Sequence, residues 1–568
     1  MSIDEIKNHF KLPIEFSKTK KQVIKNLYSD LELLESKNNN KPFYHFLFKP
    51  KTKAGEVIVE KWAENYTTDT FFLEDSQKIY NKCDIKSSHS CCEKTWDLWN
   101  NTKSSDNFIE KYQYIGSAQF DWLNKSSIFL LVLSFYSIVS PVLNLLAPII
   151  ILLIPFVILK IMKVPVTAKT YTNVLLEQLD KHSFGQLFTR FTKVSTSQKM
   201  YLILCFGMYI YNIYQSIISC KQFYNNTYYI NTYFDTFKDY LKMTKNNLGK
   251  YITLIKPYNS YNTYRDYITK NLNDIQILHD TIETMPRVSP NPLLFKNMGF
   301  VMKQFYLMNT CEDIKSLLYF SFAFNGYTDT LEGLGEKIKK KTLNNAIFNK
   351  RKTISIKENF YPLIEGKSIK NNIKIKNNII ITGPNAAGKT TLLKSTILNV
   401  LLSQQLGMGF YKNIKMQPFD HIYCYLNIPD TSGRDSLFQA EARRCGNILS
   451  NIQKKSTERH FCIFDELYSG TNPYEAIASA YSYLEVISKN KNVTFLLTTH
   501  FIKLCELFKK NKKIENRNMD TRMVGDTPKY TYKLINGISQ IKGGISVLQN
   551  LGYPSEIISK TKEILKIL

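Results

Sequence analysis

The stretch that most limits how this chain can fold is a run of 34 residues, 126–159, that carries no charged side chain. About 20 apolar residues already suffice for one helix across a bilayer, so the run is too long for a single straight span and slightly short for two. Pro141 and Pro148 stand near its middle, and Lys125 and Lys160 flank it. We therefore expect a transmembrane helical hairpin. The alternative is a buried core hairpin of a soluble protein, although such helices usually keep a polar face.

A second apolar segment, Tyr201 to Cys220, is uncharged and long enough to span a membrane. It also holds four tyrosines, an Asn and a Gln, so a membrane span and a buried helix are both open. The difference decides the topology. A hairpin alone leaves both ends of the chain on one side of the membrane, whereas a third span places the N-terminal region on the other side.

The net charge is +27, from 75 Lys and Arg against 48 Asp and Glu. Such an excess favours association with polyanions, either nucleic acid or an anionic membrane surface. Lys, Asn, Ile and Tyr are abundant throughout, however, so biased composition explains the charge equally well. The basic run 336–352 is accordingly either a solvated face or a nucleic-acid contact.

The ten cysteines are scattered and form no disulfide framework, which indicates a reducing compartment. The one cluster of metal-binding residue types is Cys83, His89, Cys91 and Cys92, and its spacing matches no paired-cysteine zinc motif. The first residues contain acids and lack an apolar core, so we expect no cleavable signal peptide and a protein that is not secreted.

A chain of 568 residues is too long for one hydrophobic core, and its residue composition and hydrophobic pattern change along its length. Residues 1–125 are polar and aromatic-rich and are expected to be α+β or helical. The transmembrane hairpin occupies 126–162, and a helical region occupies 163–350. From 353 to 568, short β-branched runs alternate with helical stretches, which predicts an α/β domain with a mostly parallel sheet.

The segment from Gly383 to Thr390 matches G-x-x-x-x-G-K-[ST] at every fixed position. It follows an apolar strand at 379–381 and precedes a helix, which is the context that a phosphate-binding loop requires. Lys389 is expected to neutralise the β- and γ-phosphates of ATP, and Thr390 to offer its hydroxyl to Mg²⁺. The remaining loop residues predicted to bind ATP through the backbone at the helix start are Gly383, Pro384, Asn385, Ala386, Ala387, Gly388 and Thr391.

Two further strands end in residues suited to ATP hydrolysis. The apolar run His460–Phe464 leads to Asp465, a candidate Mg²⁺ ligand, and to Glu466, which can polarise the attacking water. The run Val493–Thr499 ends at His500, which is placed to sense the γ-phosphate. Glu466, His500 and Lys389 are therefore the predicted catalytic residues.

The order of these motifs resembles the ABC-type ATPases and, within them, the MutS mismatch-repair family. GPNAAGKTT resembles the MutS phosphate loop, and DELYSGTNP resembles its Asp-Glu-x-x-x-Gly-Thr element. Between them, the segment from Ser436 to Glu441 resembles the Ser-x-Phe-x-x-Glu stretch by which one MutS subunit completes its partner's site. The C-terminal tail also resembles the MutS end, and no LSGGQ signature of transporter ATPases occurs.

The resemblance implies a P-loop ATPase domain of the ABC/MutS type, with core and lever helices before it and duplex DNA as partner. It also implies a homodimer with composite ATP sites, in which Ser436 acts in trans on the partner's γ-phosphate. The segment 360–375 resembles the strands beside the adenine, which makes Ile369 an apolar contact for the base.

Two departures set this chain apart from the mismatch readers. Phe72-Leu73-Glu74 fits the letters of their Phe-x-Glu wedge, but the N-terminal region is too short to hold the wedge domain, its connector and the helical core. The segment 427–430 reads NIPD where mismatch readers usually carry an Arg-containing stretch. The repair members also lack membrane hairpins, so the chain resembles a divergent, membrane-inserted branch.

These observations together predict a membrane-anchored, dimeric MutS-like ATPase that uses ATP and Mg²⁺ and binds duplex DNA and membrane lipid, with its ATPase domain on the cytoplasmic side. One alternative is a soluble mismatch-repair factor with a buried greasy helix pair. The other is a transport or remodelling ATPase that does not bind nucleic acid.

Overall fold

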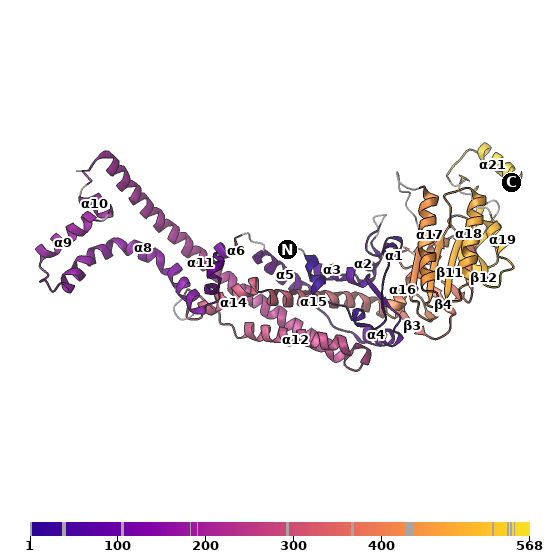
Figure 1. Ribbon diagram of the computed structural model, residues 1–568, viewed down its shortest axis with the longest axis horizontal. Helices are drawn as coiled ribbons and strands as arrows, with labels where there is room; N and C mark the ends of the chain where they lie inside the picture. Colours follow the sequence, from indigo (N-terminus) through magenta and orange to yellow (C-terminus); the bar gives the residue numbers. More distant parts are fainter. Residues whose placement is uncertain are drawn as a thin grey trace. The chain divides into compact units, whose positions relative to one another are not determined.

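The computed structural model describes residues 3–36, 41–103, 107–181, 183–189, 191–192, 194–290, 295–364, 368–426, 436–524, 527–541, 545, 548–549 and 551–567. These form two compact units, each built from segments that are far apart in the sequence. One unit consists of 90–243 and 274–318, and the other of 2–89, 244–273 and 319–568. Figure 1 follows the chain through both units. The NIPD segment at 427–430 lies outside the described residues.

The first unit is helical. Its elements are α5 (His89–Lys103), α6 (Phe108–Lys111), η3 (Ala118–Phe120), α7 (Asp121–Asn124), α8 (Ser127–Ile161), α9 (Ala168–Lys181), α10 (Ser183–Thr189) and α14 (Met298–Thr310). Three long helices, α11 (Thr196–Ile255), α12 (Asn262–Glu283) and α15 (Glu312–Lys339), have residues in both units.

The hairpin predicted within 126–162 is wrong, because residues Ser127–Ile161 form one helix, α8, with Pro141, Pro148 and Pro155 inside it. A proline removes one backbone hydrogen bond and bends a helix, but it does not force the chain to reverse. The three prolines are seven residues apart, which is nearly two full turns, so they lie on one face and bend the helix in one direction. Figure 1 shows α8 as a curved helix.

The middle of α8 is instead bonded to the first part of α11, and the two helices diverge beyond this contact (Figure 1). The Asn144 amide donates to Ser216 Oγ (2.5 Å), and the Tyr209 hydroxyl donates to the Asn144 carbonyl (2.8 Å). Further along, Cys220 Sγ contacts the Ile138 carbonyl at 3.7 Å. The pairing is antiparallel, because higher numbers on one helix meet lower numbers on the other. A helical hairpin therefore exists, but its connection is the segment 162–195.

Among the residues that the structure describes, two helices, α8 and α11, are long and apolar enough to cross a membrane. In their most apolar windows only 22% of the residues of α8 and 6% of those of α11 are buried. The second part of α11 is different, because Tyr233, Phe237 and Tyr240 are fully buried. The apolar surface of this helix is thus exposed over about its first 27 residues and covered after them.

The N-terminal part of the second unit consists of short helices around the second half of α15. Its elements are η1 (Ile3–His9), η2 (Pro13–Phe16), β1 (Lys20–Gln22), α1 (Lys25–Asp30), α2 (Phe43–Phe48), α3 (Lys53–Trp62), β2 (Asn65–Thr67), α4 (Thr70–Lys82) and η4 (Asn259–Tyr261). β1 pairs antiparallel with β2. The Trp62 ring stacks on Phe48 and on Tyr327 of α15, which places an aromatic core at the centre of this region.

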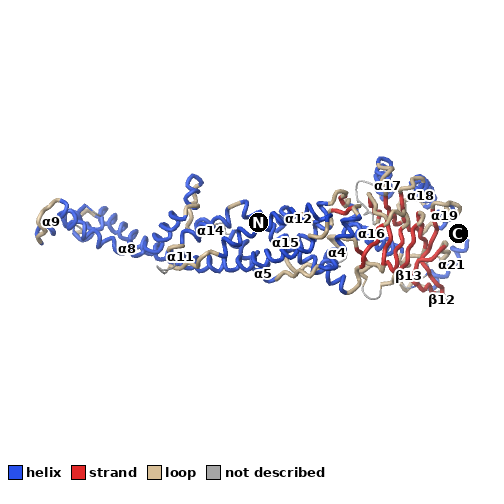
Figure 2. Tube along the Cα trace, turned by 90° about the horizontal axis from the view of Figure 1, so that it is seen from below, coloured by secondary structure: helices blue, strands red, loops and turns tan. Residues whose placement is uncertain are grey.

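The C-terminal part holds two sheets, drawn in red in Figure 2. The larger has the order β13-β12-β6-β11-β10-β9, and all its neighbours are parallel except β12 and β13. Its strands are β6 (Asn378–Thr382), β9 (His421–Tyr425), β10 (His460–Asp465), β11 (Val493–Thr499), β12 (Ile514–Val524) and β13 (Thr527–Asn536). The predicted α/β domain with a mostly parallel sheet is therefore confirmed for this part.

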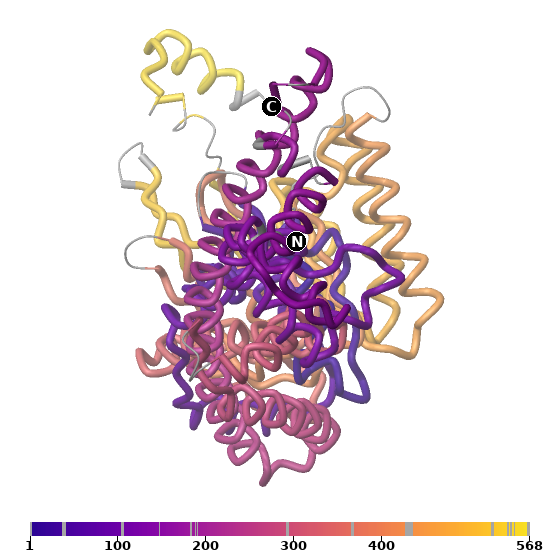
Figure 3. Tube along the Cα trace, turned by 90° about the vertical axis from the view of Figure 1, so that its left-hand side faces the viewer, coloured from indigo at the N-terminus to yellow at the C-terminus, as the bar shows by residue number. Residues whose placement is uncertain are grey.

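The smaller sheet, which the sequence did not reveal, has the order β5-β4-β8-β3-β7. It comprises β3 (Asn344–Phe348), β4 (Ile354–Asn359), β5 (Asn371–Ile375), β7 (Met408–Gly409) and β8 (Asn413–Met416). The helices of the domain are α16 (Lys389–Gln405), α17 (Leu437–Lys454), α18 (Pro473–Ser488), α19 (Ile502–Leu507) and α21 (Ser555–Ile567). Helix α21, yellow in Figure 3, lies at the margin of the domain and is exposed or half-buried over 555–564.

Candidate nucleotide-binding site

The predicted site residues meet at one edge of the larger sheet. β6, β10 and β11 are parallel, so their carboxyl ends lie at the same edge. The phosphate-binding loop follows β6, Asp465 and Glu466 stand at the end of β10, and His500 follows β11. Residues that are more than a hundred positions apart in the sequence are therefore brought together.

The loop between β6 and α16 is shaped by residues with positive φ. Gly388, the N-cap of α16, has φ 89°, and Ala386 has φ 63°. Gly388 is left-handed and also close-packed, because an added Cβ would lie 3.0 Å from the Tyr532 ring. This turn aims the start of α16 at the pocket, where free backbone amides and the helix dipole favour a phosphate.

Lys389 is the first residue of α16 and is 6% exposed. Its ammonium donates to the carbonyls of Gly383 (2.9 Å) and Pro384 (3.1 Å) and lies 3.3 Å from His500 Nε2. Burial lowers the pKa of Lys389 below its ordinary 10.5, although the nearby carboxylates of Glu466 and Asp465 oppose the shift. The loop thus holds a desolvated cation that phosphate oxygens can satisfy.

The oxygen atoms expected to hold Mg²⁺ also lie together. The Thr390 hydroxyl donates to Asp465 Oδ2 at 2.8 Å, and the Thr498 hydroxyl donates to Asp465 Oδ1. Hydroxyl and carboxylate oxygens are the donors that Mg²⁺ prefers, and it uses one or two of them beside substrate phosphates. The residues present therefore fit the ion that the resemblance implies.

Glu466 has a left-handed backbone with φ 54°, an uncommon conformation for a residue with a side chain. Its carboxylate lies 2.6 Å from His500 Nε2. The hydrogen bond from His500 holds the pKa of Glu466 below its ordinary 4.5, against the effect of burial. Glu466 is thus an ionised base at neutral pH, held by His500.

A cavity of about 520 Å³ opens over this loop. Its lining includes the loop residues 385–391 and Glu466, and it includes Ile369 as the resemblance implied. Sequence reasoning missed most of the apolar wall, because these residues come from both sheets and carry no motif. They are Phe360, Tyr361, Ile364, Met519 and Tyr532. Phosphate-binding groups at one end and aromatic side chains at the other suit a nucleotide.

Ser436 does not line this cavity. It is the exposed N-cap of α17, where its hydroxyl accepts from the Gln439 amide at 3.3 Å. One turn further, the buried Glu441 accepts from the amides of Ser469 (3.1 Å) and Gly470 (3.2 Å). The start of α17 is thus fastened to the loop that follows Glu466.

The similarity to known proteins is concentrated in the C-terminal part of the chain, which contains the nucleotide site. Residues 379–568 match the family model of MutS domain V. By this match, residues 379–568 form a domain similar to MutS domain V. It is 29% identical over 247 residues to the DNA mismatch repair protein MutS of Persephonella marina, covering 42% of this chain and 28% of that protein. It is 35% identical over 193 residues to the protein of the same name from Parabacteroides distasonis, covering 34% and 22%.

This chain spans about a quarter of the length of the curated relatives it matches. MutS domain V is an ATPase domain, so the general prediction of an ATPase is supported. The Phe-x-Glu letters at 72–74 do not form an exposed wedge, because Phe72 is buried in α4 and stacks on Tyr261. His89 lies beside Asp329 and Glu332 rather than in a described cysteine cluster.

Proposed function

We propose that this protein hydrolyses ATP as a membrane-anchored MutS-family dimer that binds duplex DNA. The observation that carries the ATPase part is the convergence of Lys389, the Thr390–Asp465 pair and the Glu466–His500 pair at one end of a nucleotide-sized cavity. The membrane, dimer and DNA parts rest on other features of the chain.

Hydrolysis of ATP needs an in-line water and neutralisation of phosphate charge rather than covalent chemistry. Lys389, buried at the start of α16, neutralises the β- and γ-phosphates. Mg²⁺, held through Thr390 and Asp465, supplies further charge neutralisation when it is bound. Glu466 orients and polarises the water, while His500 holds the Glu466 carboxylate and reaches toward the γ-phosphate. Ile369 and the aromatic wall receive the base.

The test is steady-state and single-turnover hydrolysis by the full chain and its Glu466→Gln variant. We expect the Glu466→Gln variant to bind ATP normally. Its turnover should be lower by about 10²–10⁴-fold, which is the usual rate contribution of a positioned general base. Lys389→Ala should lose binding as well as turnover. Full turnover in the Glu466→Gln protein would contradict the role given to this residue.

The membrane part rests on the exposed apolar surface of α8 and of the first part of α11. A core helix would be mostly buried, whereas these two are mostly exposed. Their polar side chains bond to each other, as in Asn144 with Ser216, which is the pattern of paired helices in lipid. We place two spans here, about residues 127–146 and 200–220, and the connection between them, which carries charge only from Lys160 onward, on the far side.

Alkaline carbonate extraction of membranes from cells that express the full chain tests the anchor. We expect the protein to remain in the membrane pellet, and a variant that carries Lys in place of Val132 and Tyr136, in the middle half of the proposed span, to be depleted from it. Both side chains are exposed on α8. A charge near the bilayer centre costs about 2.5–3.5 kcal/mol. Release of the unaltered protein into the soluble fraction would favour the soluble alternative.

The dimer part is supported by two exposed features of the ATPase domain. Ser436 stands at the exposed start of α17, outside the cavity of its own chain, where a partner's nucleotide can reach it. Helix α21 also carries exposed apolar side chains, Ile557 and Ile564, that a second copy can cover.

The DNA part is supported by the net charge of +27 and by the similarity to proteins named DNA mismatch repair protein MutS. Detergent-solubilised protein should bind duplex DNA at low salt, with an affinity that falls steeply as salt rises because phosphate contacts release counterions. No binding at low salt by protein that still hydrolyses ATP would instead favour a transport or remodelling ATPase.

A further inference from the structure

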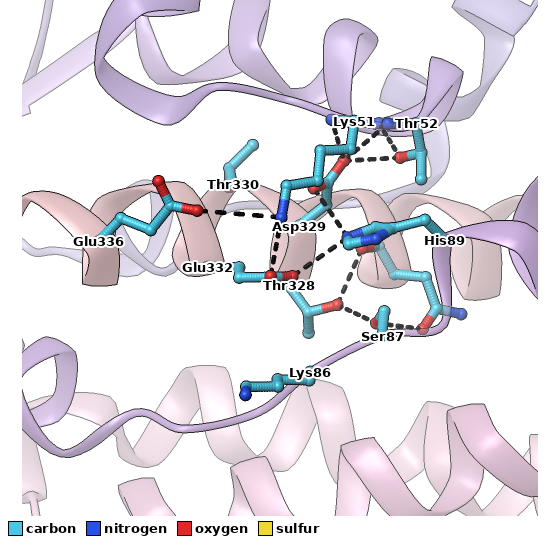
Figure 4. A network of polar contacts seen from close by, with 12 residues as sticks. Lys51, Thr52, Lys86, Ser87, His89, Thr328, Asp329, Thr330, Glu332 and Glu336 are labelled. Atoms are coloured by element: carbon cyan, nitrogen blue, oxygen red, sulfur yellow. Dashed lines mark hydrogen bonds and ion pairs between the residues drawn. The ribbon is translucent and has the colours of Figure 1, made fainter.

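We propose that His89, Asp329 and Glu332 form a binding site for a divalent transition-metal ion, best served by Zn²⁺. Figure 4 shows the three side chains turned toward one another, His89 at the start of α5 and the two acids on α15. The site is separate from the nucleotide cavity, whose lining contains none of the three. One imidazole and two carboxylates are a donor set that suits zinc.

The spacing of the donor atoms fits one ion. His89 Nε2 lies 3.4 Å from Asp329 Oδ1 and 3.1 Å from Glu332 Oε2, and the three atoms all lie within 4.8 Å of one another. Tetrahedral zinc with bonds of 2.0–2.2 Å holds its ligand atoms about 3.4 Å apart. Asp329 and Glu332 are three residues apart on a helix, so both project from the same face.

All three of these atoms are buried, and the two carboxylate oxygens have His89 Nε2 at ion-pair distance as their shared neighbour. The Asp329 side chain is 0% exposed, so Oδ1 cannot turn to water instead. A buried acceptor left without a partner costs about 1–3 kcal/mol, and more when it is charged. One cation at the point that these three atoms face would satisfy both oxygens and the His89 nitrogen together.

The other oxygen of each carboxylate is already engaged. Asp329 Oδ2 accepts from the amides of Lys51 (2.8 Å) and Thr52 (2.9 Å) and from the Thr52 hydroxyl (2.9 Å). Glu332 Oε1 accepts from Lys51 Nζ at 2.8 Å. Hydrogen bonds of this kind orient metal ligands and leave one oxygen of each carboxylate free for the ion.

The backbone around the site is held close by small residues. An added Cβ at Gly55 would lie 2.4 Å from Asp329 Oδ2, so α3 can approach the carboxylate only with glycine there. On the other side, the Ser87 hydroxyl bonds to Thr328 (2.6 Å) and Asn325 (3.2 Å) of α15, which fixes the chain two residues before His89. A bound ion would join the starts of α3 and α5 to α15 as a structural crosslink.

The charges of the cluster leave room for a cation. Three carboxylates, those of Asp329, Glu332 and Glu336, face two lysines, Lys49 and Lys51, so one negative charge remains when His89 is neutral. A proton on His89 would neutralise that charge and make the cluster an ordinary salt bridge, whereas Zn²⁺ would leave a net charge of +1. The experiment therefore has to separate metal from proton.

The test measures zinc bound to nucleotide-free, full-length protein in detergent. After incubation with ZnSO₄ and gel filtration, atomic spectrometry should find one zinc per chain in the unaltered protein, and a large loss in His89→Gln and Glu332→Gln. His279→Gln is the matched control. His279 is also buried beside two acids, but its two ring nitrogens face different ones, Asp280 and Glu283, so it cannot chelate in the same way.

Two further measurements use only the unaltered protein, so they test the proposal even if a variant does not fold. EDTA should lower the melting temperature of the unaltered protein, and Zn²⁺ but not Mg²⁺ should restore it. Cobalt in place of zinc should give a spectrum without sulfur charge transfer, which excludes Cys83, Cys91 and Cys92 as ligands. An unaltered protein without bound zinc, or equal zinc in the His89→Gln variant, would overturn the proposal in favour of the salt bridge. Neither result depends on ATP hydrolysis.

Discussion

At the scale of single residues, Lys389 has the most unusual environment in the nucleotide site. Its ammonium is buried and bonded to two backbone carbonyls, and burial lowers its pKa. A charge held in this way is costly without nucleotide and becomes favourable when phosphate oxygens reach it. The buried charge therefore lowers the stability of the nucleotide-free protein and raises its affinity for ATP.

Lys389→Met tests both effects, because it keeps the apolar stem and removes the charge. We expect the nucleotide-free variant to be at least as stable as the unaltered protein, while ATP at 100 times its dissociation constant stabilises only the unaltered protein, by about 2.7 kcal/mol. Thermal unfolding with and without ATP is the measurement. A variant stabilised by ATP as strongly as the unaltered protein would contradict the prediction.

The lowered pKa of Lys389 also gives a pH dependence with a defined sign. Between its folded pKa and 10.5, the unfolded state binds more protons than the folded state, so the free energy of unfolding rises with pH. The stability of the nucleotide-free protein relative to Lys389→Met should therefore increase as the pH approaches 10.5. Chemical denaturation at a series of alkaline pH values measures the difference in the free energy of unfolding between the two proteins. A difference that falls with rising pH would contradict a lowered pKa for Lys389.

At the scale of elements, α15 is the helix on which the N-terminal part of the second unit packs. Gly326 and Gly333 are seven residues apart and so lie on one face. Added Cβ atoms there would lie 2.6 Å from the Ala54 backbone and 1.6 Å from the Phe48 carbonyl oxygen. Backbone-to-backbone contact at these glycines is what brings Thr52 to Asp329.

Gly333→Ala should therefore destabilise the protein by about 1–3 kcal/mol, the usual cost of overpacking. Gly335→Ala, on the same helix with nothing within 4 Å of the added Cβ, is the matched control. It should stabilise the protein by about 0.5–1 kcal/mol, because alanine is the better helix former. Denaturant unfolding of both variants makes the comparison, and equal effects would mean that the close contact is unimportant.

The helix α16 connects the nucleotide site to the N-terminal part of the same unit. It begins at Lys389, and at its other end the Gln405 amide donates to the carbonyls of Trp62 (2.9 Å) and Asn65 (3.0 Å). Its neighbour Gln404 donates to the Phe419 carbonyl at 2.8 Å. Polar residues are buried here because they satisfy backbone groups that no sheet completes.

At the scale of the whole molecule, the proposed dimer can be tested by complementation in trans. Chains with Lys389→Met cannot bind ATP, and chains with Ser436→Ala cannot complete a partner's site, so each alone should be nearly inactive. A mixed dimer has one intact composite site, so random mixing should restore about a quarter of the unaltered activity. ATP hydrolysis by co-expressed chains is the measurement, and no gain on mixing would argue against the shared site.

The proposed two-span anchor, with α8 antiparallel to the first part of α11, predicts one membrane topology. Reporters fused after Asn100 and after Tyr240 should lie on the same side of the membrane, the side of the ATPase domain, and a reporter after Asp180 should lie on the other. The reason is that two spans leave both flanking segments where they began. Opposite sides for Asn100 and Tyr240 would require a different number of spans.

The sequence alone predicted which residues gather at the nucleotide site, because a phosphate-binding loop and the residues at strand ends are local patterns of fixed spacing. It placed Lys389, Thr390, Asp465, Glu466 and His500 in an α/β domain without any knowledge of contacts. It also found the apolar segments, since a run of uncharged residues is visible in one dimension.

Only the tertiary structure decided what those segments pair with. Pro141 and Pro148 indicated a turn, but a proline can bend a helix without ending it, and the true partner of α8 begins about 35 residues beyond its end. The aromatic wall of the cavity and the partners of His89 also come from distant segments. Asp329 lies 240 positions from His89, and packing at glycines on α15, rather than spacing in the sequence, brings the two together.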